Sequence, residues 1–430
     1  MKRTDTVKII KFRELGNEKL LMRCAETAGV GDIVTQIIAD VAANGDEALR
    51  RYAKKFDGAD LTSIEVSREE LDAAMEAVDP ALLRVLRLAA ENIREFHAKQ
   101  VREGFSYRRD NGAVLMQKIT PIEKAGLYIP GGTASYPSTV LMNAIPAKIA
   151  GCNEIVMVSP PSKGGTIAAP ILAAAVIAGV DRVFKVGGAQ AVAALAYGTE
   201  TVPKVDKIVG PGNAFVAEAK RQVFGRVSID MIAGPSEILV IADETADPVC
   251  VAADLLSQAE HDKMASAVLV TDSMALAKRV SDEVESQLRE LPRQEIARVS
   301  IENNGRIIVT ENLYEAIDAA NELAPEHLEI CVDEPMQYLD RIKNAGSVFL
   351  GKHCPESLGD YLAGPNHTLP TSGTARFSSP LSVDDFIKKT QCIYFPSEAL
   401  KTVKDDIALF ARSEGLEAHA RAALKRYKGE

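Results

Sequence analysis

Residues 182–197 read RVFKVGGAQAVAALAY, where a short apolar strand runs into two glycines and then into an alanine-rich helix. A strand followed by a helix is the unit from which parallel sheets are built, because the helix returns the chain to the edge where the strand began. Similar units occur on both sides of this stretch. The sequence therefore predicts an α/β protein.

Ten short apolar segments are predicted as strands, and they fall into two series. The first series lies at 126–129, 155–158, 182–186, 207–209 and 227–231, and the second at 238–242, 267–270, 306–309, 328–332 and 347–350. Glycine-containing turns and helical stretches separate the strands, which favours parallel βαβ units. Because each series suffices for one sheet, two parallel sheets are expected.

Other elements flank the two series. The pattern is helical from about 29 to 100, and His97 near the end of this region is expected on the surface. A turn at 110–112, Asp-Asn-Gly, predicts a hairpin between strands 105–109 and 113–119. The chain beyond about Pro380 is expected to be mostly helical.

The composition is that of an ordinary globular protein, and the 430 residues predict two or three domains. Sixty acidic side chains against 50 basic ones give a net charge of −10, so no nucleic-acid partner is expected. Six scattered cysteines without a C-x-x-C pair favour a reducing, cytoplasmic setting. Neither a signal peptide nor a membrane span is predicted.

Four polar side chains are candidate metal ligands. Gln258 and His261 stand three residues apart on one helix face. Asp360 could add a carboxylate oxygen and His419 a second imidazole, a donor set that suits zinc or manganese. The alternative interpretation is a polar helix end, a turn residue and a solvated helix face.

Glu326 and His327 are the candidate acid–base pair. They are adjacent, just before a predicted strand, and we expect them at the carboxyl-side rim of the sheet. Histidine titrates near neutrality and a glutamate can activate water, so the pair could divide proton transfers between them. A polar loop is the alternative.

Two glycine turns are candidates for binding a dinucleotide. Gly210 and Gly212 follow a strand, but Phe215 stands where the third glycine of the Rossmann fingerprint belongs. The turn at 187–188 opens a helix whose amides could meet a pyrophosphate, although close packing of strand and helix would also require glycine there. No G-x-x-x-x-G-K-[ST] motif is present, which argues against a P-loop kinase or ATPase.

Eight motifs, taken in order, resemble the histidinol dehydrogenase family. They are GLYIPGG (126–132), VGGAQA (186–191), DKIVGPGNAF (206–215), AGPSE (233–237), SQAEHD (257–262), APEHL (324–328), GPNHT (364–368) and SEGL (413–416). The resemblance spans nearly the whole chain. It implies a zinc enzyme that oxidises L-histidinol to L-histidine, the last step of histidine biosynthesis, by two hydride transfers to NAD through bound L-histidinaldehyde.

The resemblance also assigns site residues. The metal, zinc or manganese in its place, would be held by Gln258, His261, Asp360 and His419. The NAD site would be lined by Tyr128, Gln190 and Asn213. Catalysis would fall to Glu326 and His327. The substrate would meet Ser236, Gln258, His261, His327, Asp360, Glu414 and His419, with His367 as a further candidate.

The architecture implied is two incomplete Rossmann-like domains with parallel sheets, plus small N-terminal and C-terminal helical extensions. Residues 1–25 would be the N-terminal extension. Residues 26–125 with 237–380 would form the first domain, which carries the metal and acid–base residues, and 126–236 the second, NAD-binding domain. Residues 381–430 would complete the partner's site in a homodimer, so Glu414 and His419 would serve the neighbouring subunit.

From the residues alone, other classes of protein stay open. A thiol-dependent NAD aldehyde dehydrogenase would use Cys354 as its nucleophile. A non-catalytic α/β metabolite-binding protein would need neither a metal nor an acid–base pair. A metal-dependent hydrolase could share the ligands and would not use NAD.

Overall fold

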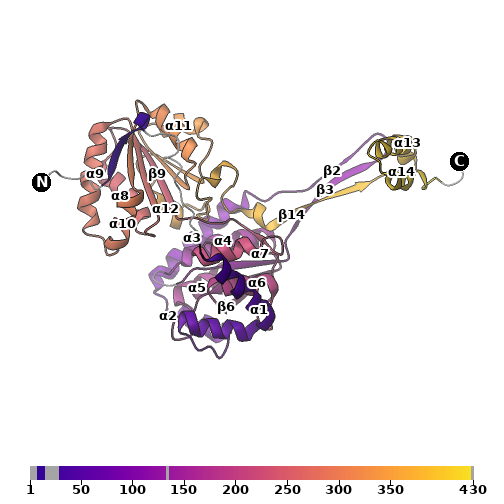
Figure 1. Cartoon of the computed structure of the whole chain (residues 1–430), viewed down its shortest axis with the longest axis horizontal. Coiled ribbons are helices and arrows are strands. Elements are labelled where there is room, and N and C mark those ends of the chain that lie inside the picture. Colours follow the sequence, from indigo (N-terminus) through magenta and orange to yellow (C-terminus); the bar gives the residue numbers. More distant parts are fainter. Residues whose placement is uncertain (1–6, 15–28, 132–134, 428–430) are drawn as a thin grey trace. The chain divides into compact units, whose positions relative to one another are not determined.

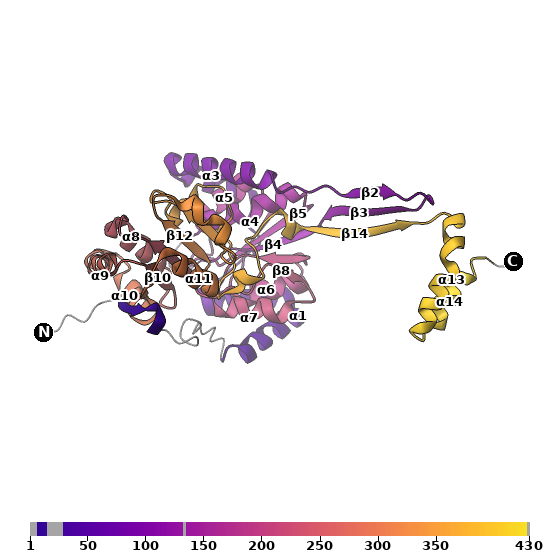
Figure 2. The ribbon, with the colours of Figure 1, turned by 90° about the horizontal axis from the view of Figure 1, so that it is seen from above.

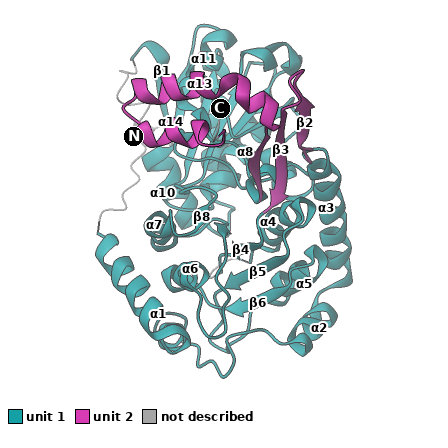
Figure 3. Ribbon diagram, turned by 90° about the vertical axis from the view of Figure 1, so that its right-hand side faces the viewer, with its two compact units in different colours: residues 1–100, 122–386 teal, residues 101–121, 387–430 magenta. Residues whose placement is uncertain are grey.

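The computed structural model describes residues 7–14, 29–131 and 135–427. The chain forms two compact units (Figure 3). Unit 1 comprises Met1–Gln100 and Ile122–Phe386, and unit 2 comprises Val101–Pro121 and Ile387–Glu430. Unit 1 contains one five-stranded and one six-stranded parallel sheet, which confirms the predicted fold class. Most of the predicted extension at 1–25 lies outside the described residues.

The five-stranded sheet, of which Figure 1 labels strand β6, has the order β6-β5-β4-β7-β8. Its strands are β4 (Lys124–Tyr128), β5 (Glu154–Ser159), β6 (Arg182–Lys185), β7 (Lys207–Val209) and β8 (Ser228–Ile229). The chain starts in the middle at β4, moves outward through β5 to β6, and then returns to β7 on the other side of β4. In open α/β sheets, ligands bind at the carboxyl ends of the strands where this reversal occurs, here β4 and β7.

The six-stranded sheet, of which Figure 2 labels β10 and β12, repeats this order with one strand added at its edge. Its order is β1-β11-β10-β9-β12-β13, so the reversal lies between β9 and β12. Its strands are β1 (Lys8–Lys11), β9 (Glu237–Ala242), β10 (Ser266–Thr271), β11 (Arg306–Val309), β12 (His327–Cys331) and β13 (Ser347–Leu350). Strand β1 was not predicted, and it pairs in parallel with β11.

Helices cover both faces of each sheet, because successive side chains of a strand point to opposite faces. On the five-stranded sheet these are α4 (Pro137–Ala150) and α5 (Ala169–Ala178) on one face, and α6 (Gly188–Tyr197) and α7 (Ala214–Val223) on the other. On the six-stranded sheet they are α8 (Pro248–Ala259), α9 (Met274–Leu288) and α10 (Gln294–Asn304), opposite α11 (Leu313–Leu323). Among the described residues, no helix is long and apolar enough to cross a membrane.

The first three helices do not pack on the sheet to which the predicted grouping of 26–125 with 237–380 assigned them. They are α1 (Gly31–Tyr52), α2 (Arg68–Ala77) and α3 (Pro80–Ala98). Helix α1 buries Val34 and Val41 in one core with β5 and α6, and α3 buries Ile93 in the other core with α4. All three helices therefore pack on the five-stranded sheet, because their apolar faces are buried in its two cores.

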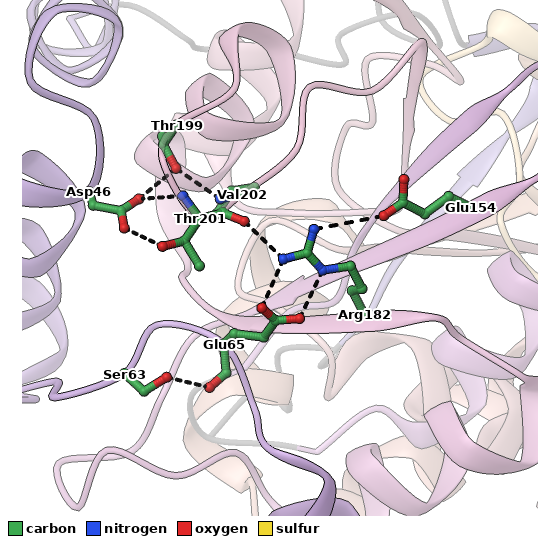
Figure 4. A network of polar contacts seen from close by, with 8 residues as sticks. All are labelled: Asp46, Ser63, Glu65, Glu154, Arg182, Thr199, Thr201 and Val202. Atoms are coloured by element: carbon green, nitrogen blue, oxygen red, sulfur yellow. Dashed lines mark hydrogen bonds and ion pairs between the residues drawn. The ribbon is translucent and has the colours of Figure 1, made fainter.

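A network of polar contacts attaches this helical layer to the sheet (Figure 4). The Asp46 carboxylate of α1 accepts hydrogen bonds from the hydroxyls of Thr199 and Thr201, which follow α6. Glu65 holds Arg182 of β6 through two hydrogen bonds of 2.8 Å each. A planar guanidinium that makes two hydrogen bonds to one carboxylate fixes both the distance and the orientation of the two groups. This contact therefore defines how the helical layer is placed on the sheet.

His97 was predicted on the surface, and this prediction was wrong. Its side chain is fully buried, and ring Nδ1 lies 2.9 Å from the carbonyl oxygen of Ile93. His97 stands four residues after Ile93 on α3, and residues at this spacing share a helix face. The apolar stripe that buries Ile93 therefore buries the imidazole too.

Unit 2 contains an antiparallel sheet in the order β14-β3-β2 and two helices. The hairpin of β2 (Phe105–Arg108) and β3 (Val114–Pro121) confirms the predicted turn. The prediction of a mostly helical chain end was only partly right, because β14 (Ile387–Tyr394) pairs along the whole of β3. Helices α13 (Ser397–Ser413) and α14 (Glu417–Leu424) follow.

The remaining helical elements are short. They are α12 (Glu356–Tyr361), a π-helical turn at Ala53–Asp57, and 3-10 turns at Phe12–Glu14, Pro335–Arg341, Thr374–Arg376 and Val383–Phe386. Helix α12 matters most for function, because it carries two carboxylates of the site described below.

Candidate active site

Glu326 and His327 lie side by side, buried at the start of β12. Both contact Glu237, the first residue of β9: His327 Nδ1 lies 2.9 Å from its carbonyl oxygen, and Glu326 Oε2 accepts a 2.9 Å hydrogen bond from its backbone N–H. The predicted position at the carboxyl-side rim was wrong. Because both residues stand where β12 begins, they lie at the amino edge of the six-stranded sheet.

The surroundings of His327 define its protonation. A carbonyl oxygen can only accept, so Nδ1 carries the proton and Nε2 is left as the basic nitrogen. Burial lowers the pKa of the imidazole, so the ring is neutral at neutral pH. Nε2 is buried and has no hydrogen-bond partner among the described residues, and it is thus available to accept a proton.

Two carboxylates of α12 lie next to His327. Glu356 Oε1 is 3.7 Å from Nε2 of His327, and atoms of His327, Glu356 and Asp360 lie within 4.8 Å of one another. Burial, and next the charge of Asp360, raise the pKa of Glu356 to about 8. Glu356 was not predicted as a site residue. A single glutamate in the first turn of a helix resembles an ordinary charge at a helix start.

Gln258 lies in the last turn of α8, and His261 follows the end of this helix. The hydroxyl of Ser257 donates to Glu356 Oε2 at 3.0 Å, which joins the end of α8 to α12. Gln258 is buried, and its Oε1 has no hydrogen-bond partner in the part of the chain that the structure describes. The charges of Asp360 and His261 both act on His327. His261 and Asp360 therefore lie near His327, and Gln258 directly follows Ser257, which contacts Glu356. Their role as metal ligands stays a prediction.

These residues fit a metal ion such as zinc. An amide oxygen that is buried without a partner is costly unless a cation or a donor meets it. An imidazole and a carboxylate beside it complete a set of nitrogen and oxygen donors that zinc accepts. His419, the fourth metal ligand that the resemblance implies, and Glu414, which it assigns to the substrate, are exposed in unit 2, and their part in this site stays a prediction.

Ser236 and His367 border the same edge. Ser236 directly precedes β9, and its carbonyl oxygen accepts a 3.0 Å hydrogen bond from the backbone of Ser266. Ring Nδ1 of His367 is 3.1 Å from the carbonyl oxygen of Asp360, while Nε2 is 3.3 Å from the hydroxyl of Thr139 on α4. His367 therefore links Asp360 of α12 to α4, a helix on the five-stranded sheet.

Tyr128, Gln190 and Asn213 stand near the carboxyl ends of the five-stranded sheet. Tyr128 ends β4, and its hydroxyl accepts a 3.0 Å hydrogen bond from the backbone N–H of Gly188. Gln190 lies in the first turn of α6, and Asn213 caps α7. Ser159 Oγ, at the end of β5, is buried without a partner. Unsatisfied polar groups at this edge fit a polar ligand such as a dinucleotide.

The two glycine turns differ in what they require. A Cβ on Gly187 would lie 2.4 Å from Cβ of Pro160, so close packing alone demands glycine there. Gly210 has φ +116°, and a Cβ would lie 2.1 Å from the carbonyl oxygen of Tyr128. The turn at 210–213 thus passes directly over the end of β4.

A buried ion pair holds this second turn. Lys220 and Asp230 contact each other at almost no solvent exposure. Lys220 Nζ donates to the carbonyl oxygen of Gly210 at 2.9 Å, and Asp230 Oδ2 accepts from its backbone N–H at 2.7 Å. The two charged side chains and the backbone of the turn thus satisfy each other's hydrogen-bonding groups, which buried charges require. Asn213 therefore starts from a rigid backbone.

Comparison with known proteins agrees with the resemblance. The sequence model described as histidinol dehydrogenase matches residues 22–427. The histidinol dehydrogenase of Geobacillus kaustophilus is 58% identical over 398 residues, which cover 92% of this chain and 94% of that protein. That of Clostridium acetobutylicum is 52% identical over 429 residues, which cover 99% and 100%. A solved histidinol dehydrogenase from Elizabethkingia anophelis is 41% identical, with a TM-score of 0.93 and coverage of 99% and 98%.

These matches decide between the classes that the residues left open. They set aside the thiol-dependent aldehyde dehydrogenase, the metabolite-binding protein and the hydrolase. The family uses NAD and Zn²⁺, which agrees with the two predicted cofactors. The chain therefore belongs to the histidinol dehydrogenase family, the enzymes of the final step of histidine biosynthesis.

Proposed function

We propose that the site at the amino edge of the six-stranded sheet oxidises L-histidinol to L-histidine in two successive steps, with L-histidinaldehyde held between them. The observation that carries this assignment is the neutral His327 with a free, buried Nε2, flanked by Glu326, Glu356 and Asp360. Each step passes a hydride to its own NAD. NAD would lie along the carboxyl ends of β4 and β7, where Tyr128, Gln190 and Asn213 are placed.

His327 would act in the alcohol step. Nε2 accepts the proton of the substrate hydroxyl as the hydride leaves the adjacent carbon. The hydrogen bond from Nδ1 to the carbonyl of Glu237 keeps the ring in the required tautomer and stabilises the positive charge that forms. Proton and hydride thus leave from neighbouring atoms of one substrate.

Glu326 would act in the aldehyde step. Its carboxylate takes a proton from the water that attacks the aldehyde, and the resulting hydrate gives up the second hydride. The backbone N–H of Glu237 holds Oε2, so Oε1 is left to face the water. Contact with the backbone of one residue, Glu237, therefore orients both members of the pair.

Gln258, His261 and Asp360 would hold zinc, together with the partner's His419. When bound, the metal would supply a Lewis acid that fixes the nitrogen atoms of the substrate. Ser236 and the partner's Glu414 would contact the same substrate, and His367 would border it. These residues orient the carbinol carbon toward the hydride acceptor, and orientation alone can account for a large part of catalysis.

We propose a homodimer in which unit 2 completes the partner's site. The support is the amount of apolar surface on unit 2: Ile393, Leu409 and Phe410 are exposed to 72%, 71% and 70%. The helical pair α13 and α14 has only a small core of its own, built from alanines. Apolar patches of this kind mark association surfaces.

Free cysteines among the described residues support the cytoplasm as the location.

The number of NADH molecules formed per histidinol tests the reaction. With purified, zinc-loaded protein, limiting L-histidinol and excess NAD, we expect two NADH for each histidinol and histidine as the only product. Absorbance at the NADH band and chromatography of the product measure both. One NADH with free aldehyde would contradict the two-step site, and no NADH would overturn the assignment.

Replacement of His261 by asparagine tests the metal site. Asparagine has a shorter side chain and no imidazole nitrogen, so we expect bound zinc to fall from one ion per chain to well below one. Metal analysis after gel filtration measures this ratio. His353→Asn is the matched control, because His353 is exposed and lies outside the site. Full zinc content in the His261 variant would refute the ligand set.

A further inference from the structure

Three acidic or thiol side chains form a cluster behind the candidate active site. They are Asp254 of α8 with Glu329 and Cys331 of β12, and one polar atom of each lies within 4.8 Å of the others. Glu329 and Cys331 are buried. None of the three is a candidate ligand or base in the reaction proposed above. A carboxyl group inside a fully covered parallel sheet is costly, and its position therefore needs an explanation.

Glu329 contacts the helix that carries the site carboxylates. Its Oε1 accepts a 2.6 Å hydrogen bond from the backbone N–H of Glu356, the first residue of α12. The first N–H groups of any helix lack partners within the helix. Pro355 precedes α12 and has no side-chain acceptor to offer. Glu329 thus caps the start of α12 from strand β12, because it accepts the hydrogen bond that an N-cap side chain would otherwise accept.

Asp254 holds Glu329 in this position. The two carboxyls are hydrogen-bonded to each other, and this bond raises the pKa of Glu329 while it lowers that of Asp254. Burial raises the pKa of both groups. A hydrogen bond between two carboxyls needs one proton, so Glu329 and Asp254 share one. Glu329 meets Asp254 with one oxygen and accepts from the backbone N–H of Glu356 with the other.

Helix α12 is seated on the sheet at a second point. A Cβ on Gly359 would lie 2.5 Å from Cε1 of Phe349, so the helix lies directly on this ring of β13. With one contact at Glu356 and one at Gly359, a helix of six residues has little freedom to shift. Its side chains at 356 and 360 then take fixed places next to His327.

We propose that Glu329, braced by Asp254, is a positioning residue that fixes α12 and thereby places Glu356 and Asp360 beside His327. The role of Asp360 as a metal ligand rests on the proposed function. The role of Glu329 is one of length and hydrogen bonding, and an ionised carboxylate is not needed for it.

Two substitutions separate length from acidity. Glu329→Gln keeps the length, an acceptor for the N–H of Glu356 and a donor for Asp254, so we expect zinc affinity and kcat within about threefold of the wild type. Glu329→Asp keeps the acid and is one methylene too short to reach that N–H. Residues that orient metal ligands typically change metal affinity by about 10- to 100-fold when mutated, and we expect this loss in Glu329→Asp.

Two measurements read out the effect. Competition with a chelator gives the zinc affinity of each variant, and hydrogen exchange of the metal-free full chain gives the protection of the peptide that covers α12. We expect faster exchange in Glu329→Asp alone. Ser273→Ala is the control, because it removes the cap of α9 on the same sheet, away from the site. It should lower thermal stability and leave zinc affinity unchanged.

The outcomes decide the proposal. Wild-type zinc affinity and exchange in Glu329→Asp would overturn it. An equal loss in both variants would also overturn it, because length and hydrogen bonding, which Glu329→Gln retains, would then not be enough. If Glu329→Asp does not fold, Pro355→Ser in the same chain supplies a capping hydroxyl to the first turn and should restore folding and zinc affinity. Failure of this rescue would also count against the proposal. A wild type that binds no zinc would instead refute the proposed metal site, and the exchange result would still test Glu329.

Discussion

Exchange of Glu326 for glutamine should slow the oxidation of L-histidinaldehyde by about 10²- to 10⁴-fold, the range that a general base contributes. Glutamine keeps an oxygen that can accept the hydrogen bond from Glu237, so the local geometry should survive. It cannot take a proton from water. Oxidation of L-histidinol, which relies on His327, should fall far less. Single-turnover measurements started from the alcohol and from the aldehyde distinguish the two steps.

The dependence on pH gives a second test of the same residue. Burial raises the pKa of Glu326 well above its ordinary value, so the basic form appears only as the pH rises. The rate of the aldehyde step in the wild type should therefore increase with pH, and this increase should be absent in Glu326→Gln. Glu334→Gln, an exposed glutamate on the same domain, is the control. Equal losses in both steps would contradict the division of roles.

A mixture of two inactive variants should regain activity. Glu326→Gln removes a residue of unit 1, and His419→Asn removes a residue of unit 2. If unit 2 serves the partner, a mixed dimer holds one site with both residues intact. Random exchange makes half of the dimers mixed, with one of two sites intact in each, so about one quarter of wild-type activity should return. Activity measured after joint refolding tests this.

The control for this experiment mixes variants within one unit. Glu326→Gln with His261→Asn should give no recovery, because both residues belong to unit 1 and no pairing of chains restores a site. Recovery in this control, or none in the mixture of units, would refute the shared site. A chain that remains monomeric by light scattering would do the same.

Most of the fold could be predicted because the strands of two covered sheets are short apolar runs between glycine turns. All ten segments of the two predicted series are strands in the structure. The two strands that were missed, β1 and β14, pair with partners far away in the sequence. Their own residues, KIIK and IKKTQCIY, are rich in lysine and lack the flanking turns that mark a strand.

The site was predictable only in part. Gln258, His261 and Asp360 each carry a weak signal, and it took the resemblance to join them. Glu329 did have a signal of its own: it interrupts the run HLEIC, in which every residue is buried. A charge inside a strand covered on both faces needs a partner. The identity of that partner, Asp254, depends on how α8 lies on the sheet, which no local pattern contains.

The pairing of β3 with β14 has a consequence for how the protein is made. Roughly 265 residues lie between Pro121 and Ile387, which are opposite each other in this ladder. A growing chain therefore leaves the ribosome with β2 and β3 long before their partner strand exists. Until then β3 has a bare edge, which invites pairing with other chains. The cell must keep this hairpin from aggregating until translation ends, and a chain that stops a few dozen residues early can never close it.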